Sequence, residues 1–256
     1  MVRVILKIIL LLIVFNLFAV VRIQAIESAS MPQPPETNKI IVIHGLTGDA
    51  AGWTSLERSL TEKGYEVILF NLPGHGGSRE DLRGVTWRDW VDAVQEVIDR
   101  ESQDGKVSIF GHSMGGLLAV YVGNLEGNSD KISSTVTFGA AFQNFTLKER
   151  VGIYLSPIIQ IFRPYYQVSG GREMPFSMLR DYLALNTAAK KSADKNIIRQ
   201  LSLHGIRDQS IPVAEAQENL MGKPNIQFET LDQPHYPESK EGFEEIALKI
   251  MDFLEP

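Results

Sequence analysis

Ser113 stands in the pentapeptide Gly111-His112-Ser113-Met114-Gly115, a G-x-S-x-G pattern whose residue types and spacing suit nucleophilic attack. The β-branched run 106–110 before it predicts a strand, and the apolar run 116–122 after it predicts a buried helix. A serine on a tight turn between strand and helix presents its hydroxyl to a substrate, and flanking glycines relieve crowding there. Ser113 is therefore the candidate nucleophile, and an ordinary glycine-rich turn is the alternative.

His235 is the candidate base that such a nucleophile requires. A serine hydroxyl attacks a carbonyl carbon only when a base takes its proton, and the base is oriented by an acid. Of the five histidines, His235 lies in a loop after the last predicted strand. Loops at the carboxyl ends of parallel strands share one edge of a sheet, so His235 and Ser113 are expected to meet there. His112 is expected to point away from the line of attack, and His204 to have a core role.

Two aspartates could orient this histidine. Asp208 follows the fifth predicted strand, and Asp232 lies three residues before His235. A carboxylate so near in sequence can bond to the local backbone instead, which favours Asp208. The oxyanion of the reaction needs two N–H donors. We expect them from Met114, after the nucleophile, and from Leu46, in the loop after the first predicted strand.

The elements that must position these residues alternate along the chain, which predicts an α/β fold with a mostly parallel sheet and helices on both faces. Apolar and β-branched runs predict strands at 39–44, 65–71, 106–110, 132–138, 196–204 and 225–230. Helical spacing predicts helices at 51–64, 85–100 and 240–254, besides the one that follows Ser113.

The interval 141–195 interrupts this alternation. It contains eight aromatic residues, and its eight basic residues outnumber four acidic ones. An apolar and basic insertion between two core strands predicts a cap over the site, and the alternative is that its aromatic residues simply pack the insertion onto the sheet. Phe162, Tyr165 and Tyr166 are the candidate substrate-binding residues of this cap.

Residues 1–25 are predicted to be a signal peptide or a membrane anchor. Arg3 and Lys7 precede an apolar run, 8–21, which is interrupted only by Asn16. Both interpretations place the rest of the chain outside the cytoplasm. Residues 26–38, with three prolines, predict a linker, and 39–256 the globular domain.

Composition narrows the chemistry further. The 256 residues include no cysteine, which excludes disulfides and a cysteine nucleophile, and the net charge of −6 gives no basic patch for nucleic acid. No phosphate-binding loop and no paired-histidine metal motif occurs in the sequence. We therefore expect that the protein needs no cofactor, metal, nucleic acid or obligate protein partner. Its expected partners are a small-molecule substrate and a membrane surface.

The order of the motifs H-G-L-T-G (44–48), N-L-P-G-H-G-G-S (71–78) and G-H-S-M-G-G (111–116), then G-x-x-D (205–208) and the final loop histidine, resembles the α/β-hydrolase superfamily, and small esterases and monoacylglycerol-lipase-like enzymes most. The resemblance implies a sheet of about six strands with a helical cap. It also implies that Ser113 is the nucleophile, Asp208 the acid and His235 the base. Asn71 departs from the aspartate that many relatives have before P-G-H-G.

The activity implied is hydrolysis of carboxylic esters, acyl or lipid-like, through an acyl-enzyme. Other serine-triad activities are the alternatives: a thioesterase, lactonase, amidase or carbon–carbon hydrolase. A ligand-binding homologue without catalysis is a further alternative, from a different functional class.

Overall fold

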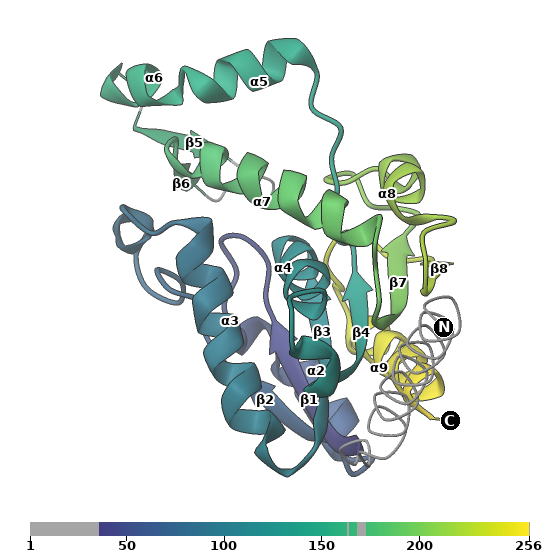
Figure 1. The fold of residues 1–256 in the computed structure, drawn as a ribbon. Helices are drawn as coiled ribbons and strands as arrows, with labels where there is room; N and C mark the ends of the chain where they lie inside the picture. The colour runs from purple at the N-terminus through teal and green to yellow at the C-terminus, as the bar shows by residue number, and fades with distance from the viewer. Residues whose placement is uncertain (1–35, 163, 168–172, 256) are drawn as a thin grey trace, which may run out of the picture. The chain divides into compact units, whose positions relative to one another are not determined.

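A six-stranded parallel sheet forms the centre of the domain in the computed structural model, which describes residues 36–162, 164–167 and 173–255. The strands lie in the order β2-β1-β3-β4-β7-β8, and every neighbouring pair is parallel (Figure 1). The predicted α/β class and strand number are therefore confirmed. The six strands are β1 Glu36–Ile43, β2 Glu66–Leu69, β3 Lys106–His112, β4 Ile132–Phe138, β7 Arg199–Gly205 and β8 Ile226–Leu231.

Alternating side chains of the strands build a core on each face of this sheet, because successive residues of a strand point to opposite sides. Ile40 and Val42 of β1 pack with α2 (Thr54–Thr61) and α9 (Lys240–Leu254). Ile41 and Ile43, between them, pack on the other face with α3 (Trp87–Glu101), α4 (Met114–Gly123) and α7 (Met178–Ala193).

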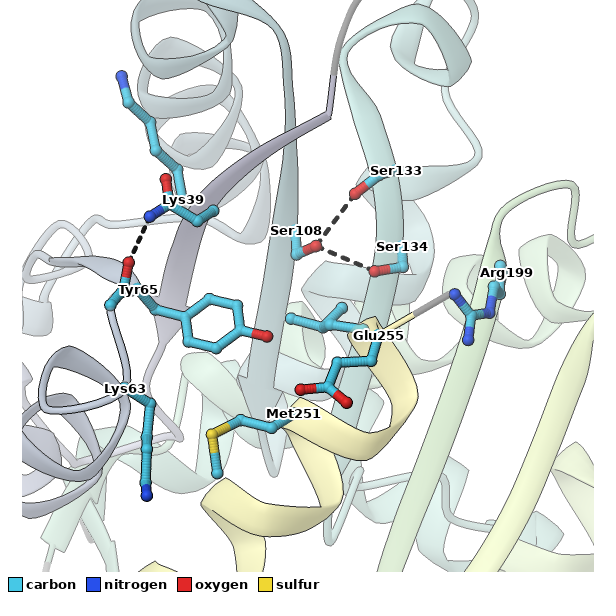
Figure 2. Close-up of a pocket in the computed structure, with 12 residues that line it drawn as sticks. Lys39, Lys63, Tyr65, Ser108, Ser133, Ser134, Arg199, Met251 and Glu255 are labelled. Atoms are coloured by element: carbon cyan, nitrogen blue, oxygen red, sulfur yellow. Dashed lines mark hydrogen bonds between the residues drawn. The ribbon is translucent and has the colours of Figure 1, made fainter.

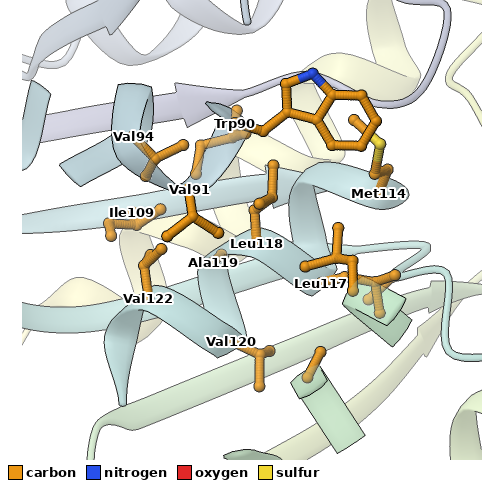
Figure 3. Close-up of a cluster of buried hydrophobic side chains, with 14 of the residues drawn as sticks. Trp90, Val91, Val94, Ile109, Met114, Leu117, Leu118, Ala119, Val120 and Val122 are labelled. Carbon is orange, nitrogen blue, oxygen red and sulfur yellow. The ribbon is translucent and has the colours of Figure 1, made fainter. Parts of the chain in front are cut away.

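Helix α4, which follows Ser113, is enclosed by this second core. Leu117, Leu118, Val120 and Val122 point in different directions around the helix, yet all four are buried. Figure 3 shows them among side chains of α3, Trp90 included, and of β3. A helix that is apolar on all sides is stable only inside a core, so α4 is held rigidly where it meets the nucleophile.

Several boundaries differ from those predicted. Strand β1 begins at Glu36, within the predicted linker 26–38. The helix predicted at 51–64 is a 3-10 turn, η1 (Ala50–Trp53), followed by α2, because the Asp49 side chain caps the turn at the Gly52 amide. Helix α8 (Val213–Leu220) was not predicted. The predicted signal peptide or anchor, 1–25, lies outside the described residues, as does the linker up to residue 35.

The interval 141–195 contains helices α5 (Leu147–Tyr154) and α6 (Ser156–Phe162), a short antiparallel pair β5 (Tyr165–Gln167) and β6 (Glu173–Pro175), and α7. In Figure 1 α5 and α6 lie beyond α7, on its far side from the sheet. Most apolar side chains of α5 and α6 are exposed. Among the described helices, none is both long and apolar enough to cross a membrane.

Candidate active site

Ser113 lies on the sharp turn between β3 and α4, with φ of 54° and ψ of −118°. A positive φ is unfavourable for a residue with a side chain and is kept only where the surroundings impose it. Here the turn is packed so closely that a Cβ on Gly115 would lie 2.2 Å from the Ile43 carbonyl oxygen. A Cβ on Gly111 would lie 2.3 Å from the Gly115 carbonyl oxygen. Both glycines are therefore required for the turn that presents the Ser113 hydroxyl.

His235 connects Ser113 to Asp208. Its Nε2 lies 3.0 Å from the Ser113 Oγ, and its Nδ1 lies 2.6 Å from the Asp208 Oδ2. These three residues follow β3, β7 and β8, so the parallel sheet brings together positions that are 122 residues apart in the chain. The arrangement lets His235 accept the serine proton at Nε2 while the carboxylate fixes the proton on Nδ1.

Asp208 is held as an ionised acceptor. Its Oδ1 accepts hydrogen bonds from the Ser210 and Ile211 amides, each at 2.8 Å. Burial alone would raise the pKa of this carboxyl, but hydrogen bonds from His204, His235 and the Ile211 amide outweigh burial and hold the pKa well below its usual range. The carboxylate is therefore charged near neutral pH.

Asp232, the competing acid, lies in a different environment. Its Oδ1 pairs with Arg207 Nε at 2.7 Å, and its side chain is 75% exposed. It makes no hydrogen bond to His235 among the contacts described. Of the two aspartates, the structure brings Asp208 to the imidazole.

The loop that carries Leu46 lies directly beside the Ser113 turn. A Cβ on Gly45 would lie 2.9 Å from His112 Nδ1 and 3.0 Å from the Ser113 Cβ, so glycine favours this close approach. Met114 is the first residue of α4, where the backbone N–H groups have no partner within the helix. Gly45, the neighbour of Leu46, thus lies against the Ser113 turn, and Met114 follows Ser113 directly.

Gly139 is a site residue that the sequence did not reveal. It follows β4 with φ of 56°, and a Cβ there would lie 3.2 Å from His235 Nδ1 and 3.4 Å from Asp208 Oδ2. The His235 imidazole and the Asp208 carboxylate therefore lie directly against the Gly139 backbone. Its place immediately after the predicted strand 132–138 is the only sequence signal that could have found it, and such glycines are common in turns.

The predicted cap residues have different surroundings. Phe162 is 85% exposed, and Tyr166 packs edge-on against Phe176. The Tyr165 hydroxyl accepts a hydrogen bond from Arg83 and donates one to Glu80, and Arg79 lies 4.0 Å above its ring. Arg79 also pairs with Glu173 of β6. These contacts fasten the β5–β6 pair to residues 79–83, and none described for the three aromatic residues reaches Ser113, Asp208 or His235.

A polar groove of about 480 Å³ lies at the opposite end of the sheet, at the amino ends of the strands (Figure 2). Three serine hydroxyls of β3 and β4 are linked there, with Ser108 Oγ 3.0 Å from both Ser133 and Ser134. No member of the Ser113–His235–Asp208 group lines it. The groove is therefore separate from the candidate active site.

Two histidines close to the site are held neutral. Burial, more than any other cause, lowers the pKa of His112 to about 3 and that of His75 to about 4. An unfolded histidine takes up a proton near pH 6.5, so below this pH the unfolded state binds more protons than the folded state.

We therefore expect the free energy of unfolding to fall as the pH drops from 6.5 to 5, by about 1.4 kcal/mol per pH unit for each such histidine. Urea unfolding at pH 7.5, 6.0 and 5.0 measures this slope. His75→Gln should reduce this slope by the contribution of one histidine, about 1.4 kcal/mol per pH unit. An unfolding free energy that does not change between pH 6.5 and 5 would contradict the neutral state of both rings.

Known proteins resemble this chain both in sequence and in fold. A sequence profile of the alpha/beta hydrolase family matches residues 40–225, which cover most of the domain. The chain belongs to the alpha/beta hydrolase family. This α/β-hydrolase is 34% identical to a thermostable monoacylglycerol lipase of Bacillus sp. (strain H-257) over 84 residues, 32% of this chain and 34% of that protein. The match thus spans about a third of the length of that curated relative.

Solved structures resemble the α/β-hydrolase over much more of its length. A metagenome-derived lipolytic enzyme superposes with a TM-score of 0.69 at 18% identity, over 84% of this chain and 93% of the other. A monoacylglycerol lipase of Paleococcus ferrophilus superposes with a TM-score of 0.65 at 17% identity, over 84% and 94%. Likeness at such low identity shows the fold alone, and it confirms the fold expected from the motifs.

Proposed function

We propose that this α/β-hydrolase is a serine hydrolase that cleaves carboxylic esters through a covalent acyl-enzyme. The observation that carries the proposal is the position of His235, 3.0 Å from the Ser113 hydroxyl and 2.6 Å from the Asp208 carboxylate. A protein that only binds ligands has no need of a nucleophile, a base and an ionised acid in one hydrogen-bonded series.

The proposed reaction follows from this order of groups. His235 Nε2 takes the proton of Ser113 as Oγ attacks the ester carbonyl carbon, and the N–H groups of Leu46 and Met114 stabilise the negative oxygen. The tetrahedral intermediate collapses, and the alcohol leaves with the proton from Nε2. Water, deprotonated by the same nitrogen, then attacks the acyl-enzyme and releases the acid and free Ser113.

Labelling with a fluorophosphonate separates catalysis from simple binding. Such a probe forms a stable bond only with an activated serine, so we expect one label per chain, located at Ser113 by peptide mapping. Absence of labelling in a folded, ligand-binding preparation would support the non-catalytic alternative. Thioester, lactone, amide and carbon–carbon substrates, assayed beside esters, decide among the other serine-triad activities.

Lipid-like acyl esters are the substrate class that we propose. Apolar side chains are concentrated on α5 and α6 and are strongly exposed, with Leu147 at 79%, Ile161 at 73% and Phe162 at 85%. Clustered apolar exposure of this kind marks a surface that meets a ligand or a membrane. The names of two relatives, a monoacylglycerol lipase and a lipolytic enzyme, agree with this class. An N-terminal segment that exports or tethers the enzyme would bring this surface to lipid.

Esters of medium acyl length are expected to be better substrates than acetate. Each methylene buried in an apolar site contributes up to about 0.8 kcal/mol, or about fourfold in kcat/KM, until the site is full. Hydrolysis of p-nitrophenyl esters from acetate to decanoate measures this profile. Replacing Phe162, Tyr165 and Tyr166 by Ala should reduce the preference for longer chains more than it reduces acetate turnover.

Leu248→Ala provides the matched control for the cap, because Leu248 is an exposed apolar residue of α9, outside 141–195. It should leave the chain-length profile unchanged. Equal kcat/KM values from acetate to decanoate would exclude an acyl-binding role and leave the interval 141–195 as packing.

A further inference from the structure

Three histidines outside the proposed triad share one feature. His44, His112 and His204 are almost fully buried, and each places a ring nitrogen against a backbone carbonyl in a catalytic loop. The distances are 2.9 Å from His44 Nδ1 to the Gly45 oxygen, 2.8 Å from His112 Nε2 to the His235 oxygen, and 2.8 Å from His204 Nε2 to the Ile211 oxygen. A carbonyl only accepts hydrogen bonds, so the nitrogen concerned carries the proton in each ring.

His44 fixes the peptide that contains the Leu46 N–H. Its Nε2 accepts a hydrogen bond from the Leu72 amide at 3.1 Å, which independently places the proton on Nδ1. Nδ1 and the Gly48 amide both donate to the Gly45 oxygen. Because a peptide unit is planar and trans, a fixed Gly45 carbonyl makes the Leu46 N–H point in the opposite direction. The orientation of the proposed oxyanion donor therefore depends on His44.

His112 fixes the loop of the base. Its Nε2–H donates to the carbonyl of His235 itself, so it holds the main chain from which the imidazole extends. The ring of His112 is held in turn between Trp53, with ring centres 4.9 Å apart, and Phe138, at 6.0 Å. The ring of His112 also lies beside the imidazole of His235, with ring centres 4.9 Å apart.

His204 fixes the loop of the acid. The carbonyl of Ile211 accepts a hydrogen bond from His204 Nε2, and the amide of Ile211 donates one to Asp208 Oδ1. The same Nε2 lies 3.4 Å from Asp208 Oδ2, the oxygen that faces His235. Nδ1 of His204 is buried and has no hydrogen-bond partner among the described residues, so this ring acts on the site through Nε2 alone.

We propose that His44, His112 and His204 are positioning residues, each of which fixes one loop of the active site through a single imidazole N–H. The loops carry the oxyanion donor Leu46, the base His235 and the acid Asp208. This inference rests on the proposed serine-hydrolase function. It accounts for three buried polar rings that the chemical steps themselves do not use.

Paired amide substitutions test it, because an Asn side chain places its N–H near the Nδ1 position of histidine and a Gln side chain places its N–H near Nε2. The proposal expects a crossed pattern. His44→Asn should retain more activity than His44→Gln, whereas His112→Gln and His204→Gln should retain more than the corresponding Asn variants. One lost N–H···O bond corresponds to about a tenfold loss, so we expect kcat of each unmatched variant to be about tenfold lower, with KM unchanged.

Folding and function are separated by two further measurements. The concentration of fluorophosphonate-labelled sites gives the active fraction, to which kcat is referred, and thermal unfolding gives stability. His75 provides the control pair: its Nδ1 lies 3.1 Å from the Pro73 oxygen, in a loop that carries none of the catalytic groups. His75→Asn and His75→Gln should have equal kcat.

Each outcome decides one question. Equal kcat within all three test pairs, or a difference of the same size between the His75 variants, would overturn the inference. A wild-type chain that neither labels nor hydrolyses esters would instead overturn the proposed function on which the inference rests. The crossed pattern with an unchanged KM would support it, since a purely structural role would follow stability rather than the position of the N–H.

Discussion

Ser113→Ala is expected to reduce ester hydrolysis by about a millionfold, the loss in kcat that removal of the nucleophile causes in a serine protease. The change removes only Oγ, and the backbone of the Ser113 turn is held by hydrogen bonds from the Gly116 and Ala141 amides to the Ser113 carbonyl. The variant should therefore stay folded. Turnover of p-nitrophenyl butyrate and labelling by fluorophosphonate should both disappear.

Ser108→Ala is the matched control for this variant. Ser108 lies on the same strand, β3, but its hydroxyl bonds to Ser133 and Ser134 at the other end of the sheet. It should retain its turnover and its label. A Ser113→Ala protein that kept even a tenth of the activity would exclude Ser113 as the nucleophile.

Asp208→Asn is expected to lower kcat by up to about ten-thousandfold without unfolding the domain. The carboxylate accepts from His235 Nδ1 at 2.6 Å, whereas an amide can present N–H there and favour the tautomer that is unable to accept the serine proton. Circular dichroism checks the fold, and kcat with p-nitrophenyl butyrate checks the effect.

Asp232→Asn separates the two candidate acids. The exposed ion pair between Asp232 and Arg207 contributes at most about 1 kcal/mol to stability. Asp232 does not contact the imidazole of His235, so kcat of the variant should be unchanged. If Asp232→Asn lowered kcat more than Asp208→Asn, the acid would have been misassigned.

The geometry around Ser113 could be predicted because it depends on local sequence and on one topological rule. The G-x-S-x-G pattern between a β-branched run and an apolar run marks the strand–turn–helix unit. Alternation of strands and helices implies a parallel sheet, and such a sheet brings the loops after β3, β7 and β8 to one edge. Ser113, Asp208 and His235 therefore meet although no local pattern connects them.

Features that depend on packing in three dimensions were not accessible in this way. Gly139 matters because of what lies above its α-carbon, which is visible only when β4 is placed beside the loops of His235 and Asp208. Helix α8 is short and buries only Ala216 and Leu220, too few apolar residues to give a clear period. Helices α5 and α6 expose most of their apolar residues, so their sequences lack the alternation of polar and apolar positions that marks a helix packed on a core.

The position of the interval 141–195 has a consequence for how such an enzyme can change over evolution. It enters the fold between β4 and β7, and these two strands pair with each other directly, from Ser134 with Arg199 to Phe138 with Leu203. Helix α7 belongs to the core, but residues of α5, α6 and the β5–β6 pair can therefore be inserted, deleted or exchanged without altering the register of the sheet. The proposed acyl-binding surface and the proposed catalytic residues are thereby encoded in separate stretches of the gene, and recombination at the two ends of α5–β6 would give the same catalytic base a new range of substrates.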